Sequence, residues 1–217
     1  TRKKMNYKNL FIKHCIEKEA LKFGQFNLKS GRVSPFFFNS GVFTDSKSVN
    51  LISDIFINVI EENKIDFKNI FGPAYKGIPL AVSLTHKIFE KNKMVVGFVF
   101  NRKDKKTHGE GGNLVGDFLP GNTIVVDDVI TAGTAIKNSL SLIMQIENIK
   151  VNDLLVILDR QEKGESNKSA SAEIKEKYNI NTHSIITIQD ILEFIETRSD
   201  FQKYQSSVRE YIEKYGV

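Results

Sequence analysis

The sequence has a single cysteine, Cys15, among its 217 residues, which excludes an internal disulfide framework. So little cysteine suits a reducing compartment, and we expect a cytoplasmic protein. No apolar run approaches the roughly 20 residues that a membrane-spanning helix needs, and no charged-then-apolar signal segment is present. Internal repeats and low-complexity linkers are also missing from the sequence. These absences argue against secreted disulfide-rich, membrane and repeat proteins.

The composition is typical of a globular enzyme or binding domain, with 41% hydrophobic and 26% charged residues. A length of 217 residues predicts one domain that is large enough to enclose a core. The net charge of +5 does not form a stripe along one helix, because much of the excess lies between Arg102 and Lys106. We therefore expect no nucleic-acid partner and no membrane partner.

The pattern of apolar segments predicts an α/β fold. Asp45 or Ser46 is the expected cap of a helix that buries Val49, Ile52, Phe56 and Val59. Strands are then predicted at 70–71, 94–100, 123–126, 154–158 and 183–188, with helices at 78–89, 134–146 and 171–178. Strands that alternate with helices indicate a doubly wound, mainly parallel sheet flanked by helices. We expect the tail, 191–215, to be helical and to pack back on this domain.

The N-terminal part has a different pattern. Residues 8–23 carry apolar positions at helical spacing, whereas 24–42 are aromatic and punctuated by glycine, as in short strands and turns. We therefore divide the chain into a small N-terminal hood, residues 1–42, and an α/β core, residues 43–217.

The segment TIVVDDVITAGTA, 123–135, carries the strongest functional signal. Its apolar run is followed by Asp127 and Asp128, then by small residues that lead into a helix. Such a turn offers backbone N–H groups and the positive end of the helix dipole to a phosphate. The turn has no lysine and no G-x-x-x-x-G-K-[ST] pattern, so the phosphate does not belong to an ordinary NTPase substrate. The two acids suit vicinal ribose hydroxyls or a hydrated Mg²⁺, although a doubled helix cap would give the same pattern.

Three further strand ends carry cationic groups. Lys76 follows the sharp turn at Gly72-Pro73, and the basic, glycine-containing loop 101–113 has the charge and length of a mobile lid over a pyrophosphate. Arg160 follows a strand and suits a bidentate contact to a planar anion. In the hood, Lys29 and the three phenylalanines at 36–38 suit closure over a flat base. Taken singly, these segments also fit solvated charges and core phenylalanines.

The segment 123–135 resembles the phosphoribosyl-diphosphate (PRPP) motif of type I phosphoribosyltransferases. Four other segments make the chain similar to the orotate phosphoribosyltransferase family in particular: KSGR with SPFFFN (29–39), YKG (75–77), RK…KTHGEG (102–111) and LDRQE (158–162). The resemblance implies Mg²⁺-dependent transfer of ribose 5-phosphate from PRPP to N1 of orotate in pyrimidine biosynthesis. The products would be orotidine 5′-monophosphate and pyrophosphate.

The resemblance also implies a role for each matching residue. The PRPP-binding residues would be Tyr75, Lys76, Asp127, Asp128, Val129, Ile130, Thr131, Ala132, Gly133, Thr134 and Ala135. Catalysis would involve Arg102, Lys103, Lys106, His108 and Asp128, and orotate would be held by Lys29, Phe37, Phe38, Thr131 and Arg160. No protein ligand is assigned directly to Mg²⁺, which PRPP and water would hold near the two acids. A homodimer is implied, with loop 101–113 shared between subunits, and any orotidine-monophosphate decarboxylase would be a separate chain.

Some alternatives stay open at this point. The spacing favours Lys106 as the key lysine, but Lys105 is its neighbour. Phe36 stands where the family more often has tyrosine, a change that is harmless if the ring faces the core. A PRPP-sensing regulator or a purine-base phosphoribosyltransferase would share the PRPP motif, although a regulator needs neither a lysine-rich lid nor an aromatic hood.

Overall fold

The computed structural model describes residues 2–28, 30–103, 113–131, 134–164 and 166–217, with side chains from residue 7 onward except at 134 and 135. Its main feature is a six-stranded sheet in the order β5-β4-β3-β6-β7-β8. The strands are β3 (Asn69–Gly72), β4 (Gly97–Asn101), β5 (Leu114–Val115), β6 (Gly121–Ile130), β7 (Ile149–Asp159) and β8 (Asn181–Thr187). All neighbours pair in parallel except β4 and β5.

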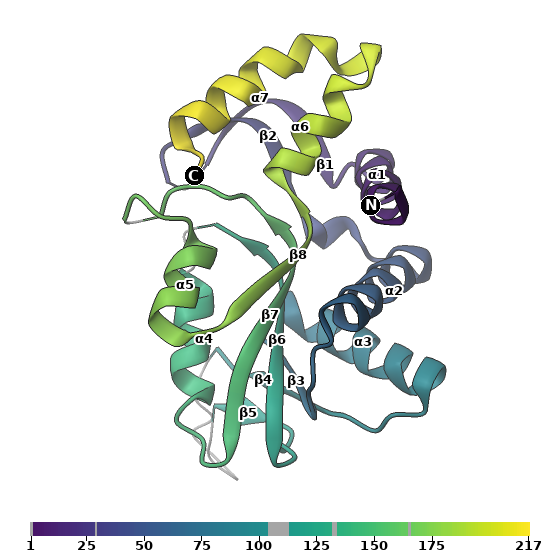
Figure 1. Cartoon of the computed structure of the whole chain (residues 1–217), viewed down its shortest axis with the longest axis vertical. Coiled ribbons are helices and arrows are strands. Elements are labelled where there is room, and N and C mark those ends of the chain that lie inside the picture. The colour runs from purple at the N-terminus through teal and green to yellow at the C-terminus, as the bar shows by residue number, and fades with distance from the viewer. Residues whose placement is uncertain (1, 29, 104–112, 132–133, 165) are drawn as a thin grey trace.

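Helices cover both faces of this sheet (Figure 1). Helices α2 (Ser46–Asn63) and α3 (Gly77–Asn92) lie on one face, and α4 (Thr134–Ile143) and α5 (Ala170–Tyr178) lie on the other. The first of these begins where the sequence predicts, because the Asp45 side chain accepts a hydrogen bond from the N–H of Ser48. The expected doubly wound α/β fold is therefore confirmed.

The hood, residues 1–42, packs against helices from the C-terminal end of the chain (Figure 1). The N-terminal part supplies α1 (Arg2–Glu17), the antiparallel hairpin β1 (Leu21–Asn27) and β2 (Val33–Phe38), and the short 3₁₀ helix η1 (Ser40–Val42). The C-terminal part adds α6 (Ile188–Glu196), the 3₁₀ helix η2 (Ser199–Phe201) and α7 (Gln202–Tyr215). Phe23 of the hairpin packs against Phe201 and Tyr204, with ring centroids 5.3 and 5.4 Å apart.

A single apolar cluster connects the hood to one face of the sheet. It runs from Phe11 and Phe36 in the hood through Phe56 and Ile124 to Tyr211 near the C-terminus. The other face of the sheet has its own cluster under α4 and α5. The division at residue 42 stays a prediction, but the described packing is continuous across it.

Several predicted boundaries are wrong. The helix predicted at 8–23 ends at Glu17 and is followed by β1, because the apolar residues near its end belong to the hairpin. The strand predicted at 94–100 begins only at Gly97, the helix predicted at 134–146 ends at Ile143, and the tail is interrupted between α6 and α7. The two-residue strand β5 was not predicted, because two residues are too few to show a strand-like alternation of apolar and polar side chains.

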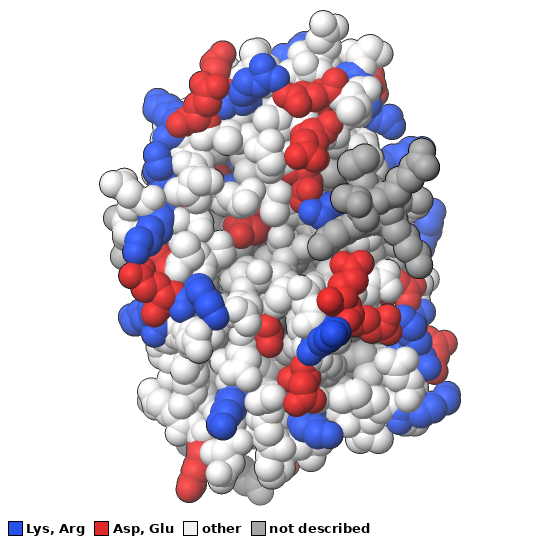
Figure 2. Space-filling model, viewed as in Figure 1, with Lys and Arg blue, Asp and Glu red and all other residues white. Residues whose placement is uncertain are grey.

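In the part of the chain that the structure describes, no helix is long and apolar enough to cross a membrane. Basic and acidic side chains are interspersed over the face shown in Figure 2, so the excess of positive charge is not gathered on that face.

Candidate active site

The site lies where the direction of sheet winding reverses. The chain passes from β3 to β4 on one side and then returns to place β6 on the other side of β3. In open α/β sheets, ligands bind at such a switch point beyond the carboxyl ends of the strands. Pairing between β3 and β6 stops at Val125, whereas pairing between β6 and β7 continues to Ile130.

The two acids therefore lie within a strand, not in the turn after it. The strand end predicted at Val126 is wrong, because the eleven-residue strand β7 stays paired with β6 as far as Ile130. Beyond the end of β3, no described strand pairs with that edge of β6 at Asp127 and Asp128, and Lys76 from the loop after β3 reaches Asp128 here.

Asp128 receives two donors on one carboxylate oxygen. The hydroxyl of Ser40 donates to Oδ2 at 2.5 Å, and the Lys76 ammonium lies 2.8 Å from the same atom. Asp128 is buried and Lys76 is half-exposed, so the carboxylate is enclosed by protein while part of the ammonium stays accessible to a ligand. A ligand with hydroxyl groups and phosphates has an acceptor and a cation within reach here.

The position of Lys76 depends on a close approach between the backbone at the start of α3 and the backbone of β6. A Cβ atom added at Gly77 would lie 2.7 Å from both the Pro73 side chain and the carbonyl oxygen of Val126. Only glycine leaves α3 this close to β6, and this closeness sets Lys76 beside Asp128. The neighbouring Tyr75 is exposed, and the Lys103 ammonium lies 4.5 Å from its ring centroid.

Asp127 has an unusual electrostatic environment. Burial raises the pKa of its carboxyl group above the ordinary value, and the adjacent charge of Asp128 raises it further. Its Oδ1 accepts a hydrogen bond of 2.8 Å from the N–H of Asp128. An acid with a raised pKa has free energy to gain when a ligand supplies hydrogen-bond donors or positive charge.

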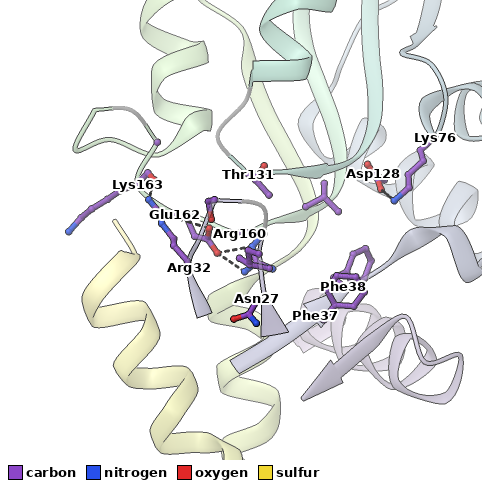
Figure 3. Close-up of a pocket in the computed structure, with 14 residues that line it drawn as sticks. Asn27, Arg32, Phe37, Phe38, Lys76, Asp128, Thr131, Arg160, Glu162 and Lys163 are labelled. Atoms are coloured by element: carbon purple, nitrogen blue, oxygen red, sulfur yellow. Dashed lines mark hydrogen bonds and ion pairs between the residues drawn. The ribbon is translucent and has the colours of Figure 1, made fainter. Parts of the chain in front are cut away.

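A cavity of about 710 Å³ opens between these strand ends and the hood. In Figure 3, Phe37 and Phe38 lie on the hood side, Thr131 and the Lys76–Asp128 pair lie on the sheet side, and Arg160 lies between them. The described residues that line the cavity are Asn27, Leu28, Ser30, Arg32, Phe37, Phe38, Lys76, Asp128, Val129, Thr131, Arg160, Glu162, Lys163 and Gly164. The volume is that of a pocket for a small molecule with a nucleotide's bulk.

Most of the predicted site residues that the structure describes converge on this cavity. Those that line it are Lys76, Asp128, Val129, Thr131, Phe37, Phe38 and Arg160. Phe36 is buried and faces the core, so its difference from tyrosine exposes nothing. Ile130 is buried as well, and its carbonyl accepts a hydrogen bond from the N–H of Arg160.

Other predicted residues lie elsewhere or outside the described part. The Arg102 guanidinium donates to the carbonyl of Leu114, and Arg102 lines a second cavity beside β5. The assigned residues Lys29, Lys106, His108, Ala132 and Gly133, and the side chains of Thr134 and Ala135, are outside what the structure describes. Their roles stay predictions.

Several residues at the site were not given a role from the sequence. Among them, Ser40, Arg32, Glu162 and Lys163 line the cavity or touch a residue that does. Glu162 had a weak signal, because a carboxylate two residues after Arg160 is a natural ion-pair partner. Arg32 stands in the KSGR segment but received no role, and Ser40 had no signal, since its contact with Asp128 spans 88 residues of sequence.

Comparison with known proteins identifies the family. No protein-family model matches the chain. The orotate phosphoribosyltransferase of Enterobacter sp. (strain 638) is 44% identical over 211 residues, which cover 97% of this chain and 99% of that protein. The chain belongs to the orotate phosphoribosyltransferase family. The orotate phosphoribosyltransferase of Klebsiella pneumoniae (strain 342) is 43% identical over the same shares of both chains.

A solved structure supports this membership in the orotate phosphoribosyltransferase family. The crystal structure of orotate phosphoribosyltransferase from Francisella tularensis superposes with a TM-score of 0.84 and 32% identity, covering 96% of this chain and 100% of that one. The resemblance found in the sequence is thereby confirmed, and the chain is an enzyme of the phosphoribosyltransferase class. The regulator and the purine-base enzyme lose their support as alternatives.

Proposed function

We propose that this protein transfers ribose 5-phosphate from PRPP to N1 of orotate, giving orotidine 5′-monophosphate and pyrophosphate, with Mg²⁺ as cofactor. The observation that carries the proposal is the single cavity that joins the Lys76–Asp128 pair to Phe37, Phe38 and Arg160. One end of it suits a sugar with phosphates, and the other suits a flat anion. Family membership supports the same pairing of donor and acceptor.

On the donor side, we assign the ribose hydroxyls to Asp127 and Asp128 and the 5′-phosphate to the segment 131–135. Helix α4 begins at Thr134, so the N–H groups of its first turn and the helix dipole favour an anion there. We assign Lys76 to the pyrophosphate; in support, its ammonium is held at Asp128 and is half-exposed at the cavity wall. Tyr75 precedes Lys76 in the chain and Lys103 lies against the Tyr75 ring, so both would border the same group.

On the acceptor side, Phe37 and Phe38 suit stacking on the pyrimidine ring, and Arg160 suits an anionic edge of orotate. Phe37 is 40% exposed, which leaves it a ring face for the base. Lys29 is assigned to the same anion from the sequence resemblance. Because orotate is already an anion, these contacts place N1 near C1′ more than they activate it.

The difficult step is cleavage of the C1′–O bond of PRPP. N1 of orotate bonds to C1′ and loses its proton, while the electron pair of the broken bond leaves with pyrophosphate. Positive charge develops on the ribose and negative charge on the leaving oxygen, so fixed cations around the pyrophosphate stabilise the transition state more than the ground state. We assign this task to Lys106, with Lys103 and His108 from the same loop, and a proton from Lys106 to the leaving oxygen. Arg102, which lines the second cavity in this chain, would join them only through the loop shared in the proposed dimer.

The acidic pair also fits a magnesium site that depends on the substrate. Among the described residues, no group of three or more metal-ligating side chains comes together. Mg²⁺ commonly uses one or two carboxylates and takes its remaining ligands from substrate phosphates and water. Asp127 and Asp128 would therefore hold the ion only together with PRPP. When bound, Mg²⁺ would neutralise charge on the departing pyrophosphate.

Turnover with three bases tests the proposal. With PRPP and Mg²⁺, we expect orotate to be consumed and pyrophosphate to be released in equal amounts, and adenine and hypoxanthine to give no pyrophosphate above background. Removing Mg²⁺ with a chelator should stop the orotate reaction. Turnover of a purine, or pyrophosphate release with none of the bases, would contradict the proposed acceptor.

We also propose that the protein is a homodimer in which loop 101–113 is shared between subunits. The side chains of Val82 and Phe89 are exposed on one face of α3, and Val95 and Phe98 are exposed in the segment that follows. Such side chains gain free energy when a second subunit covers them. Sedimentation equilibrium should give about twice the chain mass of 24.7 kDa, and a monomer at micromolar concentration would contradict this.

The decarboxylase as a separate chain and the cytoplasmic location stay predictions from the sequence.

A further inference from the structure

The guanidinium of Arg160 is held in one orientation by a buried carboxylate. Its Nε donates to Oε1 of Glu162 at 2.7 Å, and its Nη2 lies 2.6 Å from the same oxygen. Both side chains are more than nine-tenths buried. An ion pair of this kind is rigid, because the planar fork of arginine fits a carboxylate in few orientations.

The hood holds the same guanidinium from a second side. Nη2 of Arg160 also donates to Oγ of the buried Ser34 at 3.1 Å, and Cζ lies 4.2 Å from the centroid of the Phe36 ring. These contacts use Nε and Nη2. Among the described residues, no hydrogen bond to Nη1 is found, and Arg160 is part of the cavity wall. The Nη1 side is therefore the part of the group that is left for a ligand.

The C-terminal helix α7 holds it from a third side. The hydroxyl of Tyr211 donates to Oε1 of Glu162 at 2.9 Å and accepts from Nη2 of Arg160 at 3.5 Å. Tyr211 is buried, and burial together with the nearby carboxylate of Glu162 raises the pKa of its phenol group, which stays a neutral donor. The helix end is fastened to the same loop, since the N–H of Lys163 donates to the carbonyl of Tyr215 at 2.8 Å.

Glu162 also faces a second arginine. Nη1 of Arg32 lies 3.4 Å from Oε2 of Glu162, and Nη2 of Arg32 donates to the carbonyl oxygen of Lys163 at 3.0 Å. One carboxylate thus stands between two guanidinium groups at the wall of the cavity (Figure 3). This triad carries one uncompensated positive charge, and a monoanionic ligand would neutralise it.

We propose that Glu162 and Tyr211 are positioning residues for the base: they fix Arg160 so that its Nη1 side faces orotate, and α7 is thereby part of the acceptor site. The inference rests on the proposed role of Arg160 in orotate binding. An arginine that is already ordered loses little side-chain entropy when the ligand binds, and its donors meet the ligand in the right plane. Neither residue needs to touch orotate.

Tyr211→Phe tests the role of the helix, because it removes one hydroxyl and keeps the ring. We expect the KM for orotate to rise about threefold to tenfold, which is the usual effect of one lost hydrogen bond, and both kcat and the KM for PRPP to stay within about twofold. Tyr204→Phe is the matched control. It lies on the same helix and packs on Phe23, and no hydrogen bond of its hydroxyl to a described residue is found. This control should leave all three constants unchanged.

Glu162→Gln tests the charge of the triad and should raise the KM for orotate about tenfold or more, again with the smaller change in the KM for PRPP. Arg160→Lys should raise the KM for orotate by at least as much. In the double variant with Arg160→Lys, Tyr211→Phe should add nothing, since its effect passes through Arg160.

These results separate the inference from the function it rests on. An unchanged KM for orotate in Arg160→Lys would overturn the role of Arg160 in binding orotate, and the inference with it. A raised KM in Arg160→Lys, with unchanged values in Tyr211→Phe and Glu162→Gln, would overturn the inference alone. A Tyr211→Phe effect that persists at full size beside Arg160→Lys would also overturn it, because the hydroxyl would then act by another route.

Discussion

Replacing Lys106 with alanine is expected to lower kcat about 100-fold or more, with a smaller change in the KM for orotate. The reason is that the charge on the leaving pyrophosphate grows as the C1′–O bond breaks, so a cation beside it contributes most in the transition state. Removal of one such fixed electrostatic contact commonly costs two to three orders of magnitude in rate. The ultraviolet absorbance of orotate gives kcat directly at saturating PRPP and Mg²⁺.

The adjacent lysine provides the matched control for this variant. Lys105→Ala removes the same charge one position away, and we expect it to change kcat by less than about threefold. A large loss in Lys105→Ala with none in Lys106→Ala would transfer the role to the neighbour. An unchanged kcat in both variants would show that neither lysine stabilises the leaving group.

Asp127→Asn is expected to raise thermal stability above neutral pH while it lowers kcat/KM for PRPP about 10- to 100-fold or more. The loss of activity follows because the proposed hydrogen bonds from ribose hydroxyls to a charged acceptor become neutral ones. The gain in stability follows because the negative charge of Asp127 is partly withdrawn from water and lies beside the charge of Asp128. Asparagine keeps an oxygen that accepts from the N–H of Asp128 and carries no charge.

The stability gained by Asp127→Asn should increase with pH. Because the pKa of Asp127 is raised in the folded protein, the folded state binds more protons than the unfolded chain between the ordinary value near 4 and the raised value. The cost of ionising this group is absent below that window, grows through it and is complete above it. The variant lacks this cost, so its advantage in Tm should widen between pH 5 and pH 8.

Differential scanning calorimetry without PRPP and Mg²⁺ measures this difference in Tm between Asp127→Asn and the parent protein. For a chain of this length, a gain of about 1 kcal/mol corresponds to about 2–4 °C in Tm. Asp117→Asn, at an exposed position outside the main cavity, is the control and should show no such widening. A Tm advantage for Asp127→Asn that is the same at pH 5 and pH 8 would contradict the argument.

The fold could be predicted from the sequence where the spacing of apolar residues and a local capping residue indicate the same element. Asp45 caps α2 as predicted, because capping is a local hydrogen bond between residues three apart. Boundaries failed where a distant partner decides them. The end of β6 at Ile130 is set by pairing with β7, and Gly97 begins β4 because β3 lies beside it. Neither partner can be read from the segment itself.

The site shows the same division between local and long-range information. Asp128, Lys76 and Phe37 were found from the sequence because each stands in a recognisable motif at the end of a strand or in the hood. Ser40 and Tyr211 were not, since a hydroxyl 88 residues from Asp128 or 49 from Glu162 carries no local signal. Motifs therefore predicted the groups assigned to the substrates, and only the fold revealed the groups that hold them.

The hairpin β1–β2 and helix α7 lie at opposite ends of the chain, which has a consequence for synthesis. Chains are made from the N-terminus, and domains fold as their residues emerge. The strands that carry Asp127 and Asp128 emerge well before α7, whose Tyr211 and Tyr215 close over the hairpin and the loop after β7. A nascent chain stopped before residue 202 would have the sheet and its acidic pair but an uncovered hairpin. Ribosome-bound intermediates of this protein would thus gain the sheet before α7 covers the hairpin, and the acceptor half of the cavity would be completed only after α7 has emerged.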